Sequence, residues 1–185
     1  MARLVYTGLT SLDGYVADAA GNFDWSMPDD EVHTFVNDLE RGTGTQLYGR
    51  RLYEVMAVWD TLDTDEEPAV MRDYAALWKA ADKIVYSTTL DSVATTRTRL
   101  EREVDVAAIR ALKATADADI GVGGPTLAAH FIAAGLVDEY HQFLSPVIVG
   151  GGTRFLPEGV RLDLDLVEER RFGNGVVYLH YRPRA

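Results

Sequence analysis

The strongest chemical signal in the sequence is a glycine-rich segment late in the chain. Residues 120–127 read Ile-Gly-Val-Gly-Gly-Pro-Thr-Leu, so Gly123 and Gly124 separate a short apolar run from a helix-like run. Glycines let the backbone approach a ligand closely, and the N–H groups at a helix start attract phosphate oxygens. The segment is not the dinucleotide fingerprint, because Thr126 stands where a third glycine is required. A phosphate-binding turn and a tight strand-to-helix turn without a ligand both remain open interpretations.

A second junction of this kind carries two arginines. Gly49 precedes Arg50 and Arg51, and the residues that follow have helical spacing. Cations at a helix start oppose the helix dipole, and a bound anion would remove that conflict because guanidinium groups grip phosphate well. The alternative is that both arginines are exposed and only offset an acidic surface. Ser87 and Thr88 offer hydroxyl donors at the end of another predicted strand, which is a weak signal by itself.

Other kinds of catalysis have little support. The chain has no cysteine, which excludes disulfides, thiolate metal sites and a cysteine nucleophile. Ser11 and Ser145 lack the Gly-x-Ser-x-Gly surroundings of a hydrolase nucleophile. No histidine has a second histidine or a carboxylate four residues after it, as a helical zinc motif requires, so we predict no metal site. The four histidines are His33, His130, His141 and His180.

Length and charge are typical of one acidic globular domain. The 185 residues, 47% of them hydrophobic, suffice for a sizeable core, and we predict a single domain over residues 1–185. Twenty-nine acidic against 18 basic residues give a formal net charge of −11, which disfavours nucleic acid and anionic membrane surfaces as partners. The first residues hold no apolar run of signal-peptide or membrane-span length. We therefore expect a cytoplasmic protein.

Periodicity and turn residues predict the elements that would position these groups. A long irregular loop is expected at 10–27, an acidic solvated loop at 60–67, and a hairpin at Gly173-Asn174-Gly175. Strands are predicted at 3–9, 45–48, 83–86, 94–100, 119–122, 140–149, 163–171 and 176–181, and helices at 28–42, 52–59, 71–81, 106–116 and 126–134.

This order of elements predicts an α/β fold. Strands alternate with helices through most of the chain, and the last three strands run consecutively. The pattern indicates a mostly parallel central sheet flanked by helices, with an antiparallel C-terminal edge. In such sheets ligands bind beyond the carboxyl ends of the strands, where the junctions described above lie.

Taken in order, the junctions resemble the dihydrofolate-reductase-like superfamily over nearly the whole chain. The closer branch is similar to the C-terminal reductase domain of the bifunctional riboflavin-biosynthesis deaminase–reductase and its stand-alone relatives. The resemblance is carried by residues 11–17 (Ser-Leu-Asp-Gly-Tyr-Val-Ala), 48–54 (Tyr-Gly-Arg-Arg-Leu-Tyr-Glu), 122–127, 135–140 and 145–152.

The resemblance implies an NADPH-dependent reductase. It implies that the glycine–arginine junction binds cofactor phosphates, that the strand-end hydroxyls lie beside the adenosine 2′-phosphate, and that the later glycine turn holds the pyrophosphate. The implied cofactor-binding residues are Gly14, Gly49, Arg50, Arg51, Ser87, Thr88, Gly123, Gly124, Thr126 and Leu127.

For the substrate side, the resemblance implies catalytic roles for Asp13, Trp25 and Asp30. The loop from Asp13 to Trp25 would cover the nicotinamide and the substrate. The order Trp25-x-x-Pro28-x-Asp30 puts Asp30 where folate reductases carry the acid that binds the pteridine. The alternative is that Asp30 only complements a helix N-terminus. The acidic stretch 60–67 departs from the folate enzymes, in which an arginine holds the glutamate tail.

The expected activity is therefore reduction of a pterin-like or ribosylaminopyrimidine-like heterocycle by NADPH. Folate reduction proper and NADPH binding without catalysis are the alternatives. We also expect a homodimer, because the long apolar run at 140–149 would otherwise expose an edge strand, and dimers are common among the riboflavin-type relatives that the chain resembles.

Overall fold

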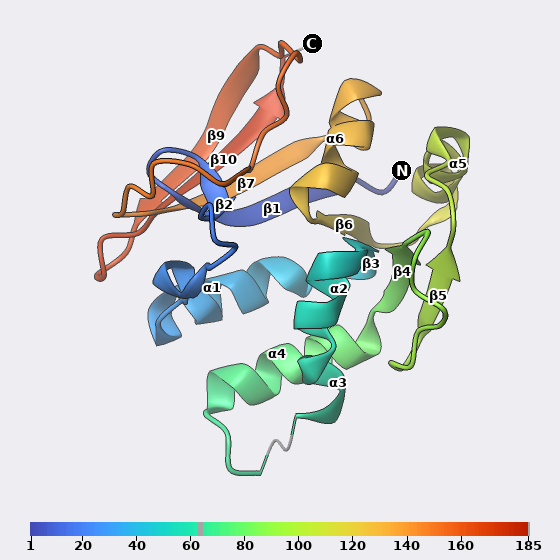
Figure 1. Ribbon diagram of the computed structural model, residues 1–185, viewed down its shortest axis with the longest axis horizontal. Helices are drawn as coiled ribbons and strands as arrows, with labels where there is room; N and C mark the ends of the chain where they lie inside the picture. The colour runs from blue at the N-terminus through green and yellow to red at the C-terminus, as the bar shows by residue number, and fades with distance from the viewer. Residues whose placement is uncertain (63–64, 185) are drawn as a thin grey trace.

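The computed structural model describes residues 1–62 and 65–184 and is built on one large sheet (Figure 1). The strands are β1 (Leu4–Ser11), β2 (Tyr15–Ala17), β3 (Thr43–Gly49), β4 (Asp82–Tyr86), β5 (Thr98–Glu101), β6 (Asp119–Gly123), β7 (Glu139–Ser145), β8 (Thr153–Arg154), β9 (Leu164–Arg171) and β10 (Val177–Pro183). The helices are α1 (Asp30–Glu40), α2 (Arg50–Met56), α3 (Val58–Thr61), α4 (Ala69–Ala80), α5 (Val106–Thr115) and α6 (Pro125–Ala133), with a 3₁₀ turn η1 (Asp24–Ser26).

The eight-stranded sheet has the order β5-β4-β3-β6-β1-β7-β10-β9. Neighbouring strands from β5 to β7 are parallel, and β10 is antiparallel to both β7 and β9. The predicted fold class, a mostly parallel sheet with an antiparallel C-terminal edge, is confirmed. The small pair β2 and β8 forms a separate antiparallel sheet.

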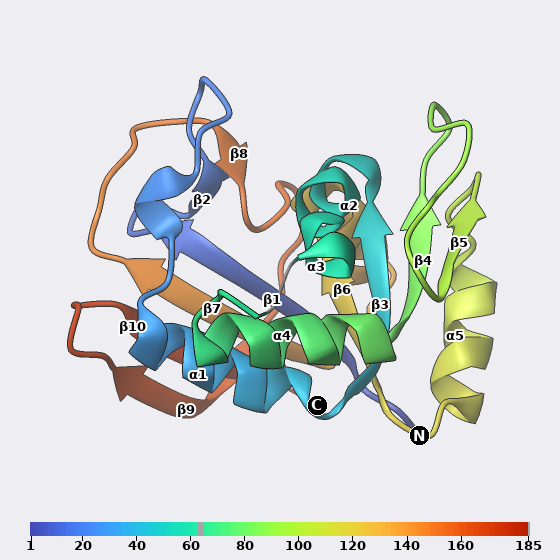
Figure 2. The same cartoon turned by 90° about the horizontal axis from the view of Figure 1, so that it is seen from below.

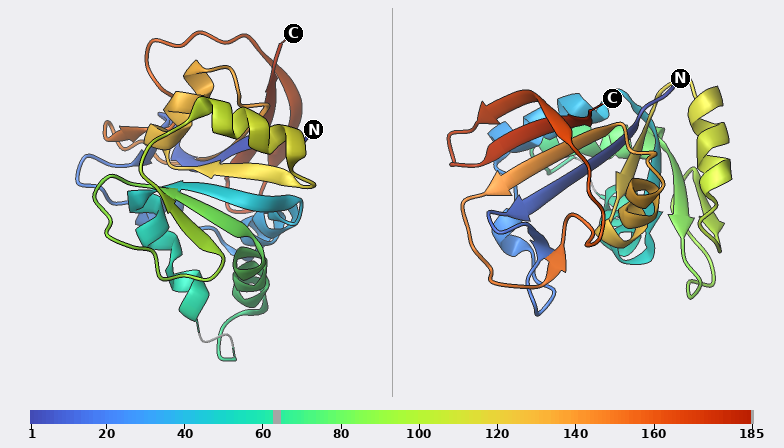
Figure 3. Two further views of the ribbon diagram at one scale, coloured as in Figure 1. Left: turned by 90° about the vertical axis from the view of Figure 1, so that its right-hand side faces the viewer. Right: turned by 90° about the horizontal axis from the view of Figure 1, so that it is seen from above.

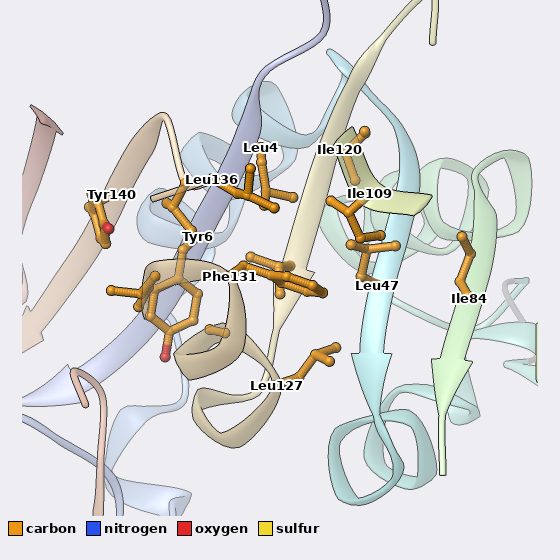
Figure 4. Close-up of a cluster of buried hydrophobic side chains, with 14 of the residues drawn as sticks. Leu4, Tyr6, Leu47, Ile84, Ile109, Ile120, Leu127, Phe131, Leu136 and Tyr140 are labelled. Atoms are coloured by element: carbon orange, nitrogen blue, oxygen red, sulfur yellow. The ribbon is translucent and has the colours of Figure 1, made fainter. Parts of the chain in front are cut away.

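Helices cover both faces of the sheet (Figure 3). Helices α5 and α6 lie on one face, where the largest apolar cluster joins Leu4 and Tyr6 of β1 to Phe131 of α6 (Figure 4). On the other face α1 packs against β7 and β10 through Val32, and α2 and α4 pack against β3 and β4. These two layers make β1, β3 and β6 rigid central strands, so the turns at their carboxyl ends have fixed positions.

Two predictions about segments adjoining β1 and β7 were wrong. The segment 10–27 is not irregular, because it completes β1, forms β2 and η1, and is braced by Asp18, which accepts hydrogen bonds from the Ala20 and Asn22 amides. The strand predicted over 140–149 ends at Ser145, before Pro146, and β7 lies between β1 and β10 rather than at an edge. An exposed β7 edge therefore gives no argument for a homodimer.

Three further boundaries differ from prediction. The helix expected over 52–59 is divided into α2 and α3, and the strand expected from residue 94 begins only at Thr98. In the acidic loop expected at 60–67, Asp60 belongs to α3 and bonds to Thr96, while residues 63–64 lie outside the described residues. Within the described ranges, no helix has both the length and the apolar character that crossing a bilayer requires.

Candidate functional site

The two predicted junctions lie side by side at the carboxyl edge of the sheet (Figure 2). β3 and β6 are neighbours, with Tyr48 opposite Gly123, and Gly49 is opposite Tyr86 of β4. The chain leaves β3 directly into α2 and leaves β6 directly into α6. Both helix starts therefore point their N–H groups toward the same edge, as the topology of parallel strands requires.

The turn after β6 favours glycine at both of its positions. A Cβ on Gly123 would overlap the Leu52 side chain and stand 3.0 Å from the Tyr48 ring. Gly124 has a φ of +93° and is the N-cap of α6, with Pro125 following. A positive φ favours glycine because it has no Cβ. Packing therefore explains the glycine at position 123, and backbone conformation explains the glycine at position 124.

The two arginines at the junction of β3 and α2 differ in their ion-pair partners. Gly49 is the N-cap of α2 and has no side-chain cap. Arg50 Nη1 is 3.1 Å from Glu54 Oε1, one helical turn on. Arg51 is exposed and, in the described part of the chain, has no ion-pair partner. Both arginines lie in the first turn of α2, where the helix dipole makes a cation least favourable. The unpaired Arg51 guanidinium is therefore available to bind an anion.

The hydroxyls after β4 are not equivalent. Ser87 is buried, and its Oγ accepts hydrogen bonds from the Thr89 and Leu90 amides, at 3.1 and 3.0 Å. It therefore shapes the turn, whereas Thr88 is exposed. Arg102, a residue our sequence analysis missed, donates to the Ser87 carbonyl at 3.1 Å. It directly follows β5, so the same strand-end logic could have found it.

The two predicted cofactor-binding residues at the start of α6 differ in exposure. Thr126 is exposed, whereas the Leu127 side chain is buried in the main core and lies 3.8 Å from the position of a Cβ on Gly49. Leu127 can therefore offer a ligand only its backbone. By helix geometry, the N–H groups of the first turn have no intrahelical acceptor.

Asp13 joins two loops beyond the end of β1. Its carboxylate accepts hydrogen bonds from the Val149 amide at 3.2 Å and the Gly150 amide at 2.8 Å. Hydrogen bonding from the Ser11 hydroxyl, followed by these amides, lowers the pKa of Asp13. Gly14 follows with a φ of +87°, and its amide closes a turn onto the Ser11 carbonyl. The carboxylate is thus held ionised as a bridge between residues 11–14 and 147–150.

The other two predicted catalytic residues lie on the β1 side of the site. Trp25, in η1, is half-buried and donates from Nε1 to the Asn22 carbonyl at 3.2 Å. Asp29 is the N-cap of α1 and accepts from the Val32 amide at 3.0 Å. Asp30 is the first residue of α1 and exposes its side chain. Asp29 therefore caps the helix and Asp30 lies in its first turn, where an exposed carboxylate can complement the helix dipole or bind a ligand, so both interpretations of Asp30 stay open.

The chain is similar to one protein family over nearly its whole length. Residues 2–178 match the family model described as the RibD C-terminal domain. The uncharacterized protein YyaP of Bacillus subtilis (strain 168) is 28% identical over 183 residues, covering 97% of this chain and 94% of that protein.

Solved structures share the fold at low identity. The diaminohydroxyphosphoribosylaminopyrimidine deaminase/5-amino-6-(5-phosphoribosylamino)uracil reductase of Thermotoga maritima superposes with a TM-score of 0.68 at 18% identity, over 99% of this chain and 57% of that chain. This chain thus spans little more than half of the bifunctional protein. Dihydrofolate reductase from Enterococcus faecalis, complexed with NADP(H) and RAB-propyl, superposes with a TM-score of 0.64 at 14% identity, over 99% and 97% of the two chains.

Proposed function

Because the chain belongs to the RibD C-terminal domain family, we propose that it is an NADPH-dependent reductase of a small polar heterocycle. The substrate class is a ribosylaminopyrimidine or a pterin, each with a reducible C=N or C=O group. The Thermotoga relative is named as a reductase of such an aminouracil, and the Enterococcus relative is complexed with NADP(H).

One observation carries this proposal: two glycine turns meet at the edge where two helices begin. A Cβ on Gly124 would lie 3.9 Å from the Gly49 amide nitrogen and 3.8 Å from Leu52 Cβ. The two turns thus form one continuous backbone surface, with Arg50 and Arg51 beside it. Backbone N–H groups and guanidinium groups together suit a diphosphate, which needs several donors at short range.

The residues present fit NADPH on two grounds. A Cβ would clash with Leu52 at Gly123, and the positive φ of Gly124 favours glycine, so the turn carries no side chains and its backbone can approach a ligand. Thr88, Arg51 and Arg102 provide exposed or turn-linked donors on neighbouring strand ends, where a 2′-phosphate requires hydrogen bonds and positive charge. Bound NADPH would supply the hydride, and the chain's residues would bind, orient and shield it from water.

Folate reduction is the second candidate, and Asp30 is the observation that favours it. Its carboxylate is exposed at the start of α1, the position of the pteridine-binding acid in the motif described above. Asp30→Asn tests this candidate: it should abolish reduction of a pterin if Asp30 binds the pteridine, and it should leave reduction of an aminopyrimidine nearly unchanged if Asp30 acts only at the helix start.

The test combines binding with a substrate panel. NADPH and NADH are titrated into the purified full chain, and NADPH oxidation is then followed with dihydrofolate, other pterins and ribosylaminopyrimidines. Arg51→Ala should weaken NADPH by about 1.5–3 kcal/mol, the range of a charged hydrogen bond. Arg110→Ala removes an exposed arginine of α5 and serves as the control. Absence of NADPH binding would refute the proposal. Binding without oxidation of any member of the panel would favour a non-catalytic NADPH-binding protein.

A further inference from the structure

A second polar centre lies on the same sheet, away from the proposed cofactor edge. His141 of β7 and His180 of β10 are direct cross-strand partners, and Glu139 lies two residues before His141 on the same face of the strand. Glu139 pairs with Val5, near the amino end of β1, whereas the proposed cofactor edge lies at the carboxyl ends of the parallel strands. All three residues are buried.

Three potential ligand atoms converge in this cluster. Glu139 Oε2 lies 3.3 Å from His141 Nε2 and 3.4 Å from His180 Nε2, and the three side chains offer ligand atoms that all lie within 4.8 Å of one another. A tetrahedral ion with ligand bonds of about 2.0–2.1 Å requires ligand atoms about 3.3–3.4 Å apart. The two distances from Glu139 Oε2 to the histidine nitrogens therefore already match the separation that such an ion needs.

The surrounding side chains orient two of the three ligands. The Tyr178 hydroxyl is 3.0 Å from His141 Nδ1, which turns Nε2 toward Glu139. Arg3 and Arg182 donate to Glu139 Oε1, at 2.8 Å and 2.6 Å for the shortest contacts, and leave Oε2 facing the imidazoles. Partners of this kind fix the orientation of metal ligands in protein sites.

His180 supplies a second observation that favours a ligand here. The residue is only 7% exposed, and its Nε2, although 3.4 Å from Glu139 Oε2, makes no hydrogen bond to any described residue. A buried polar nitrogen without a partner is costly, so native proteins normally satisfy it. A metal ion equidistant from the three ligand atoms would do so, and it would use the neutral form of each imidazole. Burial lowers the pKa of both histidines, which favours the neutral imidazole that binds metal ions.

The cluster also has space for further ligands. It lines a cavity of about 200 Å³ between the end of α1 and the sheet, which Thr7 and Glu168 line as well. An open coordination position for water or a small molecule is typical of sites with three protein ligands. The charge balance permits a cation: Arg3 and Arg182 are offset by Glu139, by Asp119, which pairs with Arg3, and by Glu168, the cross-strand partner of His180.

We propose that Glu139, His141 and His180 bind one divalent transition metal ion of the zinc type. Two imidazoles and one carboxylate are borderline and hard donors, which suit Zn²⁺ and Co²⁺ better than Ca²⁺ or Mg²⁺. The competing explanation is a metal-free hydrogen-bonded cluster, in which Tyr178 donates to His141, His141 donates to Glu139, and water in the cavity bonds to His180. Only the first explanation predicts that the chain binds one metal ion at this cluster.

The experiment is a Co²⁺ titration of the tag-free full chain after removal of metals with a chelator. We expect the visible absorption bands of low-coordinate Co²⁺ to saturate at one ion per chain and to be displaced by Zn²⁺. His180→Gln should weaken Co²⁺ binding by about tenfold or more. His130→Gln changes an exposed histidine of α6 and should bind as wild type does.

Two outcomes of the titration would overturn the proposal. One is a wild-type chain that takes up no Co²⁺ or Zn²⁺, and the other is a His180→Gln chain that binds as wild type does. Circular dichroism checks that each variant folds. If His180→Gln does not fold, His141→Gln replaces it, and X-ray absorption of the Zn²⁺-loaded wild type independently counts its imidazole ligands. A spectrum without two imidazoles would refute the assigned site.

Discussion

Gly49 of the β3–α2 junction and Gly124 of the β6–α6 junction lie next to each other. A Cβ on Gly124 would stand 3.9 Å from the Gly49 amide nitrogen. The residues are 75 positions apart in the chain, yet each is the N-cap of a helix, of α2 and α6 respectively. Their contact merges two helix starts into one surface, which neither junction would provide alone. The binding of a diphosphate would therefore depend on both turns.

Gly124→Ala should destabilise the fold. At a φ of +93° an alanine costs about 1–3 kcal/mol of backbone strain, and urea unfolding would measure the loss. Gly42→Ala is the matched control, since Gly42 has no positive φ and a Cβ there would meet only the Leu39 carbonyl, at 3.9 Å. It should stay within about 1 kcal/mol of wild type. Equal stability of the two variants would contradict the strain at Gly124.

Glu54→Gln should strengthen NADPH binding. Glu54 engages Arg50 in a half-exposed ion pair, which competes with any phosphate for that guanidinium. Removing an exposed partner of this kind changes the free energy by up to about 1 kcal/mol, so the Kd should fall by up to about fivefold. Asp165→Asn loses one charge at a distant pair with Arg184 and controls for net charge. A weaker affinity in Glu54→Gln would mean that Glu54 orients Arg50 for binding.

Trp25 should report cofactor binding through its fluorescence. It is half-buried in η1, which contacts β1, whereas Trp78 is buried in the cluster between α4 and the sheet. NADPH should quench tryptophan emission, and Trp25→Phe should remove much of that change. Trp59→Phe, on α3, should leave most of the quench in place. If the quench persists in Trp25→Phe, the residue that covers the cofactor lies elsewhere.

We expect the chain to form a homodimer through β9, one of the two edge strands of the large sheet. Its Leu166 and Val167 are 50% and 46% exposed, and an edge strand presents unpaired backbone groups. Light scattering should give twice the chain mass of 20.4 kDa. Leu166→Lys should lower that mass toward the monomer, whereas Val58→Lys, at an exposed position of α3, should not. A wild-type mass near 20.4 kDa at micromolar concentration would contradict the expectation.

Lys83 should make stability rise with pH above neutrality. Its buried ammonium donates to the Trp78 and Ala81 carbonyls, and burial lowers its pKa from 10.5 to about 8. Between these values the unfolded chain binds more protons than the folded one, so the free energy of unfolding increases with pH. The gain from pH 8 to 9.5 should be about 1–2 kcal/mol.

Urea unfolding across this pH range measures the effect. The rise should be absent in Lys83→Met, which changes a residue of β4, and kept in Lys79→Met, which changes a lysine near the end of the preceding helix, α4. Comparing slopes rather than stabilities removes the constant cost of the lost hydrogen bonds. A wild-type slope that Lys83→Met reproduces would assign the titration to another group.

Local sequence determined the junctions. Gly124 allows the positive φ of the turn, Pro125 begins α6 and Asp29 caps α1, and each of these acts within one turn of the chain. The alternation of strands and helices then requires a mostly parallel sheet, which brings the strand ends to one edge. For this reason the fold class and the glycine and arginine positions at that edge could be predicted without coordinates.

Only the tertiary structure decided which distant residues meet. The interior position of β7 depends on the order in which strands join the sheet, and no local pattern encodes that order. His141 and His180 are 39 residues apart, and their pairing depends on the register of β7 against β10. A search for helical spacing could not find them, because a one-residue slip in that register would turn His180 to the opposite face.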